Sequence, residues 1–282
     1  MPRFLFWNYR CKLPDKEEIL ARLIHHEVVD VVLLAESSCE PNRLSDRLSS
    51  SGRPYQWLPS SDQRFQIFAG YSDKVFSQIR VHDKLRLMIF HPPGHPEMIL
   101  GVVHLDSGLY RERAERKTIA TELSRSVRLF QRERRHSRSI IVGDFNLNPF
   151  DDGMISPEGF GGMMTKRLVQ KNALSQNDRS SRFYNPIWKR LGSDILDGAP
   201  GTYYWRQQRE FNIFWNYVDQ VLVGHDLLDY FPDSRFRILT AIPGLNEPSF
   251  LIRETKAHWK IEVSDHLPIL FDVDLPSEAD HD

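Results

Sequence analysis

The segment 139–148 combines a short apolar strand with two polar side chains at its end. The β-branched run 140–142 predicts a buried strand, which Gly143 is expected to end. Asp144 and Asn146 stand two residues apart, and in extended backbone this spacing places both side chains on one side. A carboxylate can accept a proton from water or hold a cation, and a carboxamide can donate to an oxyanion. The pair suits hydrolysis of a phosphate ester, although taken alone it is more typical of a strand-end cap or turn.

Three more polar residues occupy the same kind of position, at the end of a predicted apolar strand: Asn8 in the strand 3–9, Glu36 after 28–35, and His104 after 98–103. A carboxylate at the end of a buried strand is costly unless it is paired or binds a cation, so Glu36 is the strongest candidate in the first half. A histidine there is more often structural, but this one belongs to a series. We therefore expect the four side chains to form a site at one edge of a layered fold.

The last third of the chain adds a second set of candidates. Asp219 lies within a predicted strand at 217–223 and requires a partner, for which histidine is the usual choice in catalytic pairs. Asp265 and His266 directly precede the apolar strand at 267–271. These residues add two carboxylates and a second histidine to the first group.

The remaining pattern predicts one domain at 1–275, followed by a frayed tail at 276–282. Short strands between residues 64 and 90 are expected to pair as an antiparallel meander. Residues 149–200 read as an insertion of loops and one helix near the site, where substrate specificity often resides. Its aromatic segment 183–188 fits substrate binding and plain packing equally well.

Composition limits the possible partners. The chain has 282 residues and a formal net charge of −1, which excludes a protein that binds nucleic acid through overall positive charge. Between residues 111 and 138 there are ten Arg or Lys against four Glu, in a predicted helix at 111–134. This basic helix is either an ordinary solvated face or a phosphate-backbone contact surface. Two cysteines, no signal-like segment and no membrane-length apolar run predict a cytoplasmic protein without membrane insertion. The sequence does not identify protein partners.

Taken in order, these motifs resemble the endonuclease/exonuclease/phosphatase superfamily, whose fold is that of DNase I. The matching positions cover nearly the whole chain: Trp7-Asn8, Leu34 to Glu36, His104-Leu105, Gly143 to Asn146, Thr202-Tyr203, Val218-Asp219, and Ser264 to His266. Each short motif is weak alone, but the ordered set is specific. The resemblance implies an α+β fold, a four-layer α-β-β-α sandwich with two packed mixed β-sheets flanked by helices. It also implies a metal-dependent phosphoric-ester hydrolase that uses Mg²⁺, with Mn²⁺ as a possible substitute.

The resemblance also implies a role for each residue. Glu36 would bind the metal, assisted by Asn8 and Asp265, because Mg²⁺ commonly takes few protein ligands. Asp144 would position or deprotonate the attacking water, and Asn146 would hold the phosphate or the nucleophile.

The histidines complete the implied machinery. His266, oriented by Asp219, would donate to the phosphoryl oxygens or transfer a proton, and His104 would stabilise the phosphorus centre or assist the leaving group. Attack on phosphorus would be in line.

The sequence departs from the family pattern at two places, and the first of them narrows the subclass of enzyme. Members that cut at abasic sites carry a loop tyrosine where this chain has Val103-His104, which favours the branch of DNase I-like nucleases, deadenylases, tyrosyl-DNA phosphodiesterases and sphingomyelinases. The usual Arg-Ile-Asp is Tyr217-Val218-Asp219 here.

Three classes of function remain. We expect a nuclease, endo- or exonucleolytic, that hydrolyses phosphodiester bonds in nucleic acid. The alternative is a phosphatase or phosphodiesterase acting on a lipid, an inositol phosphate or another small phosphate ester. A binding module that has lost catalysis would be expected to lack at least one acidic or histidine residue of the set, and none is missing.

Overall fold

The computed structural model describes most of the chain, namely residues 1–59, 64–107, 113–176, 182–191, 199–205, 214–242, 249–254 and 259–277. Two large β-sheets form the main part of this structure. The first has six strands in the order β14-β19-β1-β2-β4-β3. Their bounds are β1 (Arg3–Asn8), β2 (Val31–Ala35), β3 (Gln56–Trp57), β4 (Phe65–Ala69), β14 (Arg237–Ile238) and β19 (Ile269–Asp272).

The second sheet has seven strands in the order β5-β6-β7-β8-β13-β10-β9. Their bounds are β5 (Phe76–His82), β6 (Leu85–Phe90), β7 (Met98–His104), β8 (Ser139–Asp144), β9 (Gly162–Met163), β10 (Phe183–Tyr184) and β13 (Asp219–Gly224). Both sheets are mixed, since β1 pairs parallel with β2 and β7 parallel with β8, whereas most other pairs are antiparallel.

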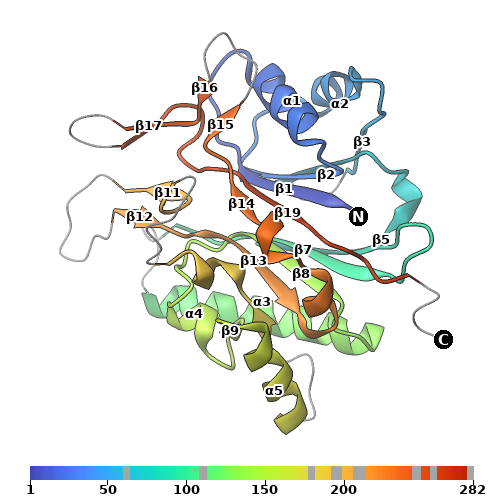
Figure 1. The fold of residues 1–282 in the computed structure, drawn as a ribbon, viewed down its shortest axis with the longest axis vertical. Coiled ribbons are helices and arrows are strands. Elements are labelled where there is room, and N and C mark those ends of the chain that lie inside the picture. The colour runs from blue at the N-terminus through green and yellow to red at the C-terminus, as the bar shows by residue number, and fades with distance from the viewer. Residues whose placement is uncertain are drawn as a thin grey trace.

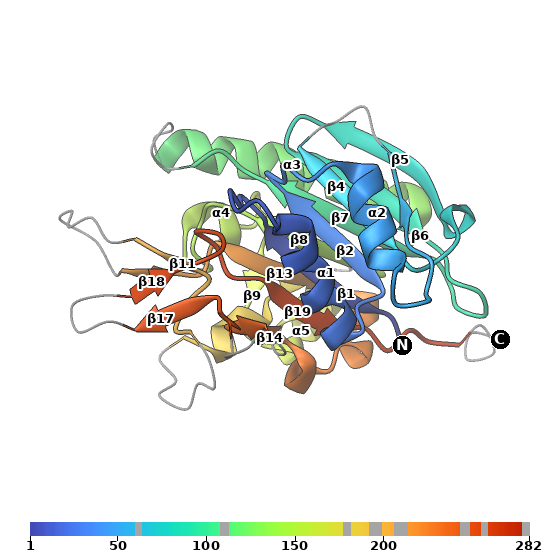
Figure 2. The ribbon, with the colours of Figure 1, turned by 90° about the horizontal axis from the view of Figure 1, so that it is seen from above.

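Helices cover the outer faces of the two sheets. Figure 1 shows α1 and α2 on the side of the six-stranded sheet and α3 on the side of the seven-stranded sheet, and Figure 2 shows α1 and α2 in front of β1 and β2. The helices are α1 (Lys16–Glu27), α2 (Pro41–Ser49), α3 (Arg113–Arg134), α4 (Asp152–Ile155) and α5 (Lys166–Gln176), with 3₁₀ turns η1 (Asp73–Val75), η2 (Pro186–Lys189), η3 (His225–Tyr230) and η4 (Asp233–Arg235). The predicted four-layer α-β-β-α sandwich is confirmed.

Strand alternation builds two cores, because successive side chains point to opposite faces of a sheet. Ile140 and Val142 of β8 belong to the large core that includes both β-sheets, whereas Ile141 between them packs in a second core with Leu123 and Phe130 of α3. All three β8 side chains are fully buried. Coverage on both faces explains why this strand is apolar without interruption.

Three further two-stranded sheets complete the described elements: β11 (Tyr203–Tyr204) with β12 (Trp215–Asn216), β15 (Ala241–Ile242) with β16 (Ser249–Phe250), and β17 (Ile252–Glu254) with β18 (Trp259–Ile261). In both views β11 and β17 lie at the end of the sandwich opposite the C-terminus. The strand β1 runs from the N-terminus toward that same end.

Two local predictions were wrong. The strands between residues 64 and 90 do not form one meander, because β4 pairs with β2 in the six-stranded sheet whereas β5 and β6 belong to the other sheet. Gly143 does not end its strand but lies within β8. A Cβ at this position would overlap the carbonyl oxygen of Val103, so glycine permits the close approach of β7 and β8.

Candidate active site

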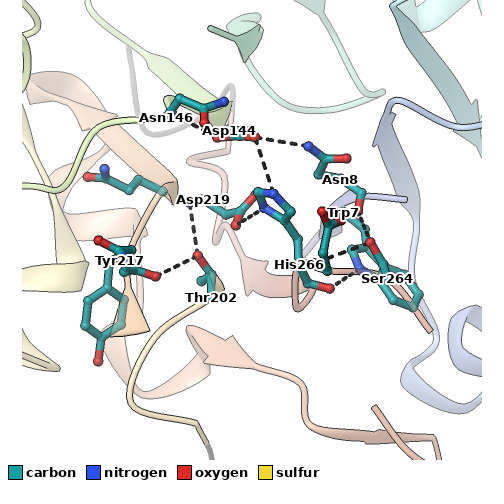
Figure 3. A network of polar contacts seen from close by, with 12 residues as sticks. Trp7, Asn8, Asp144, Asn146, Thr202, Tyr217, Asp219, Ser264 and His266 are labelled. Atoms are coloured by element: carbon teal, nitrogen blue, oxygen red, sulfur yellow. Dashed lines mark hydrogen bonds and ion pairs between the residues drawn. The ribbon is translucent and has the colours of Figure 1, made fainter. Parts of the chain in front are cut away.

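Asp144 ends β8 and belongs to the polar cluster drawn in Figure 3. Its Oδ2 accepts a hydrogen bond from the Asn8 side-chain amide at 3.0 Å and lies 3.8 Å from Nε2 of His266 and 3.9 Å from Nε2 of His104. The side chain is almost fully buried. Burial raises the pKa of Asp144 to about 6, although the two histidines oppose this effect. The carboxylate is therefore an effective proton acceptor close to neutral pH.

Asn146 departs from the extended geometry expected from the sequence. Its φ of 47° lies in the left-handed region, which asparagine tolerates better than most residues. As a result its backbone N–H donates to Oδ1 of Asp144 at 2.8 Å, and its side-chain amide donates to the carbonyl of Leu105 at 2.8 Å. Arg116 of α3 holds the turn by donating to the carbonyl of Asn146 at 2.7 Å. Asn146 thus fixes the orientation of the Asp144 carboxylate.

Asp219 and His266 form a buried pair from distant parts of the chain. Nδ1 of His266 lies 2.9 Å from Oδ2 of Asp219, and both side chains are buried. Burial lowers the pKa of His266, but the carboxylates of Asp219 and Asp144 outweigh it and raise that pKa to about 10. Nδ1 is held by Asp219, so Nε2 of a positively charged imidazolium points toward Asp144 (Figure 3). A proton donor and a proton acceptor therefore face each other.

Glu36 follows β2 and forms the third part of the site together with Asn8 and His104. Its backbone has φ 49°, a conformation that is uncommon for glutamate and typical of functional turns. Oε1 of Glu36 accepts from the Asn8 amide at 3.1 Å and lies 3.1 Å from Nε2 of His104. The hydrogen bond with His104, aided by Asn8 and Arg10, lowers the pKa of Glu36 to about 2 against the effect of burial. Glu40, not Glu36, caps helix α2.

The donor set around Glu36 fits a divalent cation. Oδ1 of Asn8 is buried and has no hydrogen-bond partner among the described residues, which leaves an amide oxygen available as a ligand. Asp265 is about half exposed, and its Oδ2 lies 3.9 Å from the guanidinium of Arg10, which also lies 3.7 Å from Oε2 of Glu36. Two carboxylates thus converge on one positive charge. Oxygen ligands of this kind are those that Mg²⁺ prefers.

A second group of three acceptors consists of Asp144, Asp219 and His266, whose ligand atoms lie within 4.8 Å of one another. The close contact between His266 and Asp219 occupies one nitrogen and one oxygen of this group. This group therefore suits proton transfer, whereas Asn8, Glu36 and Asp265 offer three oxygen donors of the kind that hold a cation.

Three supporting residues were not assigned a role from the sequence. The hydroxyl of Thr202 accepts from the backbone N–H of Asp219 at 3.1 Å, and that of Ser264 donates to the carbonyl of Asn8 at 2.7 Å. Tyr203 packs against the ring of His266, with centroids 4.7 Å apart. Thr202 and Ser264 occur in the motifs that carry the resemblance, but only the three-dimensional contacts show what each side chain holds.

Two other predicted features do not belong to the site as described. Several arginines of α3 bind protein groups: Arg116 binds the carbonyl of Asn146, Arg128 the carbonyl of Glu158 at 3.3 Å, and Arg134 the carboxylate of Glu97 at 2.6 Å. In the aromatic segment, Phe183 and Tyr184 are fully buried in β10. These contacts favour structural roles for the basic helix and for both aromatic residues.

The fold and the arrangement of acids, amide and histidines define a phosphoesterase of the α-β-β-α sandwich class. The model of the endonuclease/exonuclease/phosphatase family matches residues 5–266, and the chain belongs to this family. Members of the family are divalent-metal-dependent hydrolases of phosphoric esters. A search of curated protein sequences finds no match.

Solved structures of the family share the fold at low sequence identity. A 3′ phosphatase, NExo from Neisseria, bound to a product DNA hairpin, gives a TM-score of 0.58 at 15% identity over 97% of this chain and 100% of the other. A family protein from Bacteroides thetaiotaomicron gives 0.56 at 13% identity over 96% and 93%. TDP2 from D. rerio, complexed with a single-strand DNA product, gives 0.55 at 16% identity over 96% and 97%. At these identities the likeness establishes the fold alone.

Proposed function

We propose that this protein is a Mg²⁺-dependent phosphodiesterase that hydrolyses nucleic acid, with Mn²⁺ able to replace Mg²⁺. The observation that carries the proposal is the pairing of a buried proton acceptor with a buried proton donor: Oδ2 of Asp144 lies 3.8 Å from Nε2 of His266, whose Nδ1 is held by Asp219. An acceptor and a donor at this spacing suit attack by water on phosphorus and protonation of the departing oxygen.

Asn8, Glu36 and Asp265 would hold the cation. When bound, a divalent cation at this position polarises the phosphate ester and offsets the charge that develops in the transition state. Glu36 is suited to this role because its low pKa keeps it ionised throughout the working pH range.

The other side chains then have defined tasks. Asp144 accepts a proton from the attacking water, and Asn146 keeps the carboxylate oriented through its backbone N–H. His266 donates a hydrogen bond to a phosphoryl oxygen or a proton to the leaving group, while Asp219 maintains its charged form. His104, at the end of β7 in the other sheet, lies beside Glu36 and stabilises the negative phosphate.

Support for nucleic acid as the substrate comes from related structures, because NExo and TDP2 were each solved with a DNA product. We further propose that residues 1–275 act as one domain with the insertion at 149–200 forming part of the substrate surface, and that the protein works in the cytoplasm. None of the described helices is long and apolar enough to cross a membrane.

The proposal is tested by incubating the purified protein with labelled single- and double-stranded DNA and RNA, in Mg²⁺ or in excess chelator, beside Asp144→Ala. We expect at least one of the four substrates to be cleaved in Mg²⁺ only, and the cleavage to be lost in the variant. If no substrate is cleaved, or if Asp144→Ala cleaves as fast as the wild type, the proposal is wrong.

A second candidate is hydrolysis of a smaller phosphate ester, such as a lipid or inositol phosphate. The contacts of the α3 arginines with Asn146, Glu158 and Glu97 favour it, because they reduce the positive charge available for a nucleic-acid backbone. Hydrolysis of such an ester in Mg²⁺, with no cleavage of any oligonucleotide, would select this alternative.

A further inference from the structure

Arg10 lies at the cation site although it is not one of the residues implied by the resemblance. It follows Asn8 by two positions, in the loop after β1. Its Nε lies 3.7 Å from Oε2 of Glu36, and its Nη1 lies 3.9 Å from Oδ2 of Asp265. The guanidinium therefore joins the same two carboxylates that we propose as ligands of the cation.

A guanidinium and a divalent cation cannot both neutralise these two carboxylates at close range. The ion pairs of Arg10 are loose, because both distances exceed that of a direct hydrogen bond and its side chain is 57% exposed. Exposed pairs of this kind contribute little free energy. Replacement of the guanidinium by a cation of higher charge is therefore favourable, and the exposed arginine is able to move aside.

Arg10 also acts electrostatically on Tyr203, which lies beside His266. Tyr203 packs against His266. Burial, and to a lesser extent the carboxylates of Asp265 and Asp144, raises the pKa of Tyr203 to about 12, and the positive charge of Arg10 opposes this rise. Arg10 is thus electrostatically coupled to the tyrosine beside His266 as well as to Glu36. Its planar group of donors matches two oxygens of a phosphate.

We propose that Arg10 binds the substrate phosphate and that cation binding releases it for this role. Without the cation, Arg10 neutralises Glu36 and Asp265. With the cation in place, the guanidinium is free to bind non-bridging oxygens of the substrate. The exchange strengthens substrate binding when the metal site is loaded. This inference rests on the proposed function, since it assigns a substrate contact to the same site.

The first experiment tests whether Arg10 competes with the cation, and it requires no turnover. Binding of Mn²⁺ to metal-free wild type, Arg10→Gln and Arg22→Gln is measured by electron paramagnetic resonance of the free ion. Arg22 is a matched control, because it is a similarly exposed arginine paired with a carboxylate, Glu18, within α1. We expect Arg10→Gln to bind Mn²⁺ about 2- to 5-fold more tightly, as loss of a competing exposed ion pair predicts, and Arg22→Gln to match the wild type. Equal or weaker Mn²⁺ binding by Arg10→Gln would overturn the competition.

The second experiment tests whether Arg10 binds the substrate phosphate. It uses the Asp144→Asn background, which prevents cleavage. Binding of a short fluorescein-labelled single-stranded DNA is measured by anisotropy with Mn²⁺ and with chelator. We expect Arg10→Gln to weaken binding about tenfold in Mn²⁺, which is the effect of one lost charge-assisted hydrogen bond. In chelator the loss should be about 2- to 5-fold smaller, because the ion pairs with Glu36 and Asp265 then compete for the guanidinium. An equal loss under both conditions, or no loss in Mn²⁺, would overturn the metal-conditioned role.

The two experiments separate this inference from the proposed function. If the wild type cleaves no nucleic acid yet Arg10→Gln still binds Mn²⁺ more tightly, the proposed function fails and the competition at the cation site stands. If the wild type is an active metal-dependent nuclease and Arg10→Gln changes neither Mn²⁺ binding nor DNA binding, the inference about Arg10 fails alone.

Discussion

Replacement of Asp219 by asparagine tests the pairing that holds the candidate general acid in its charged form. Oδ2 of Asp219 lies 2.9 Å from Nδ1 of His266, and both groups are buried. Asparagine has nearly the same shape but carries no charge, so Asp219→Asn removes the stabilisation of the imidazolium without creating a cavity. We expect the pKa of His266 to fall toward physiological pH, so that a larger fraction of the imidazole is neutral there and proton donation is weakened.

The magnitude follows from the pKa of His266, which is about 10 in the folded protein. An unperturbed histidine has a pKa of about 6.5, and each unit is worth about 1.4 kcal/mol, so the site favours the imidazolium by about 5 kcal/mol. Asp219 and Asp144 share this effect, and Asp219 makes the closer contact. We assign at least half to Asp219, so the pKa of His266 in the variant should fall to about 8 or below, and kcat should fall by about 10²- to 10⁴-fold.

The pKa is measured by nuclear magnetic resonance titration of the histidine ring protons in metal-free protein, with His266→Gln used to assign the signal. The sign of the stability effect gives a second check. Because the folded pKa is raised, the pair stabilises the fold fully below about pH 6.5, and the stabilisation is lost as the pH rises through about 10. The difference in unfolding free energy between wild type and variant should therefore shrink over that range.

Asp226→Asn is the matched control, because Oδ1 of Asp226 makes a similar contact, 3.0 Å from Nδ1 of His225. This pair directly follows β13, at the end of the strand opposite Asp219. The rise of an extended strand places it about 20 Å from Asp219. It should leave kcat unchanged. The reasoning is refuted if the His266 signal titrates at the same pH in Asp219→Asn as in the wild type, or if both variants reduce kcat equally.

Three further predictions concern the neighbours of this pair. Glu36→Gln should weaken Mn²⁺ binding by more than about tenfold, measured by paramagnetic resonance of the free ion, and unchanged binding would remove Glu36 from the cation site. Thr202→Val should cost about 1–3 kcal/mol in urea unfolding, because the buried N–H of Asp219 loses its acceptor, and a neutral result would contradict that contact. In metal-free wild type, the unfolding free energy should fall by about 3 kcal/mol as the pH rises from about 4 through about 6, because buried Asp144 must ionise over this range. Asp144→Asn should abolish this fall. If the unfolding free energy of the variant falls over the same range, another group is responsible.

The sequence alone located the strand ends from which the site is built. Asn8 ends β1, Asp144 ends β8 one residue beyond the end predicted at Gly143, and Glu36 directly follows β2. Such prediction works because apolar runs and the polar residue that ends each of them are local properties of the chain. The resemblance then added the order of the motifs, which predicted the sandwich.

The errors arose where partners distant in the chain decide the structure. The strand β4 looks like β5 and β6 in sequence, yet it pairs with β2 in the other sheet. The turn at Asn146 depends on contacts with Leu105 and Arg116, and no strand periodicity reveals them. Arg10 was missed for the same reason, because its two partners are Glu36 and Asp265.

The central claim is that water attacks phosphorus at a metal-loaded site with Asp144 as the proton acceptor. The most direct measurement is a single-turnover reaction in water enriched in the heavy oxygen isotope, with Mg²⁺ and the preferred substrate, followed by mass spectrometry of the products. The account predicts that the heavy oxygen enters the phosphate product in the wild type and that Asp144→Ala forms no labelled phosphate. Incorporation into the leaving hydroxyl, or labelled phosphate at the wild-type rate from Asp144→Ala, would contradict it.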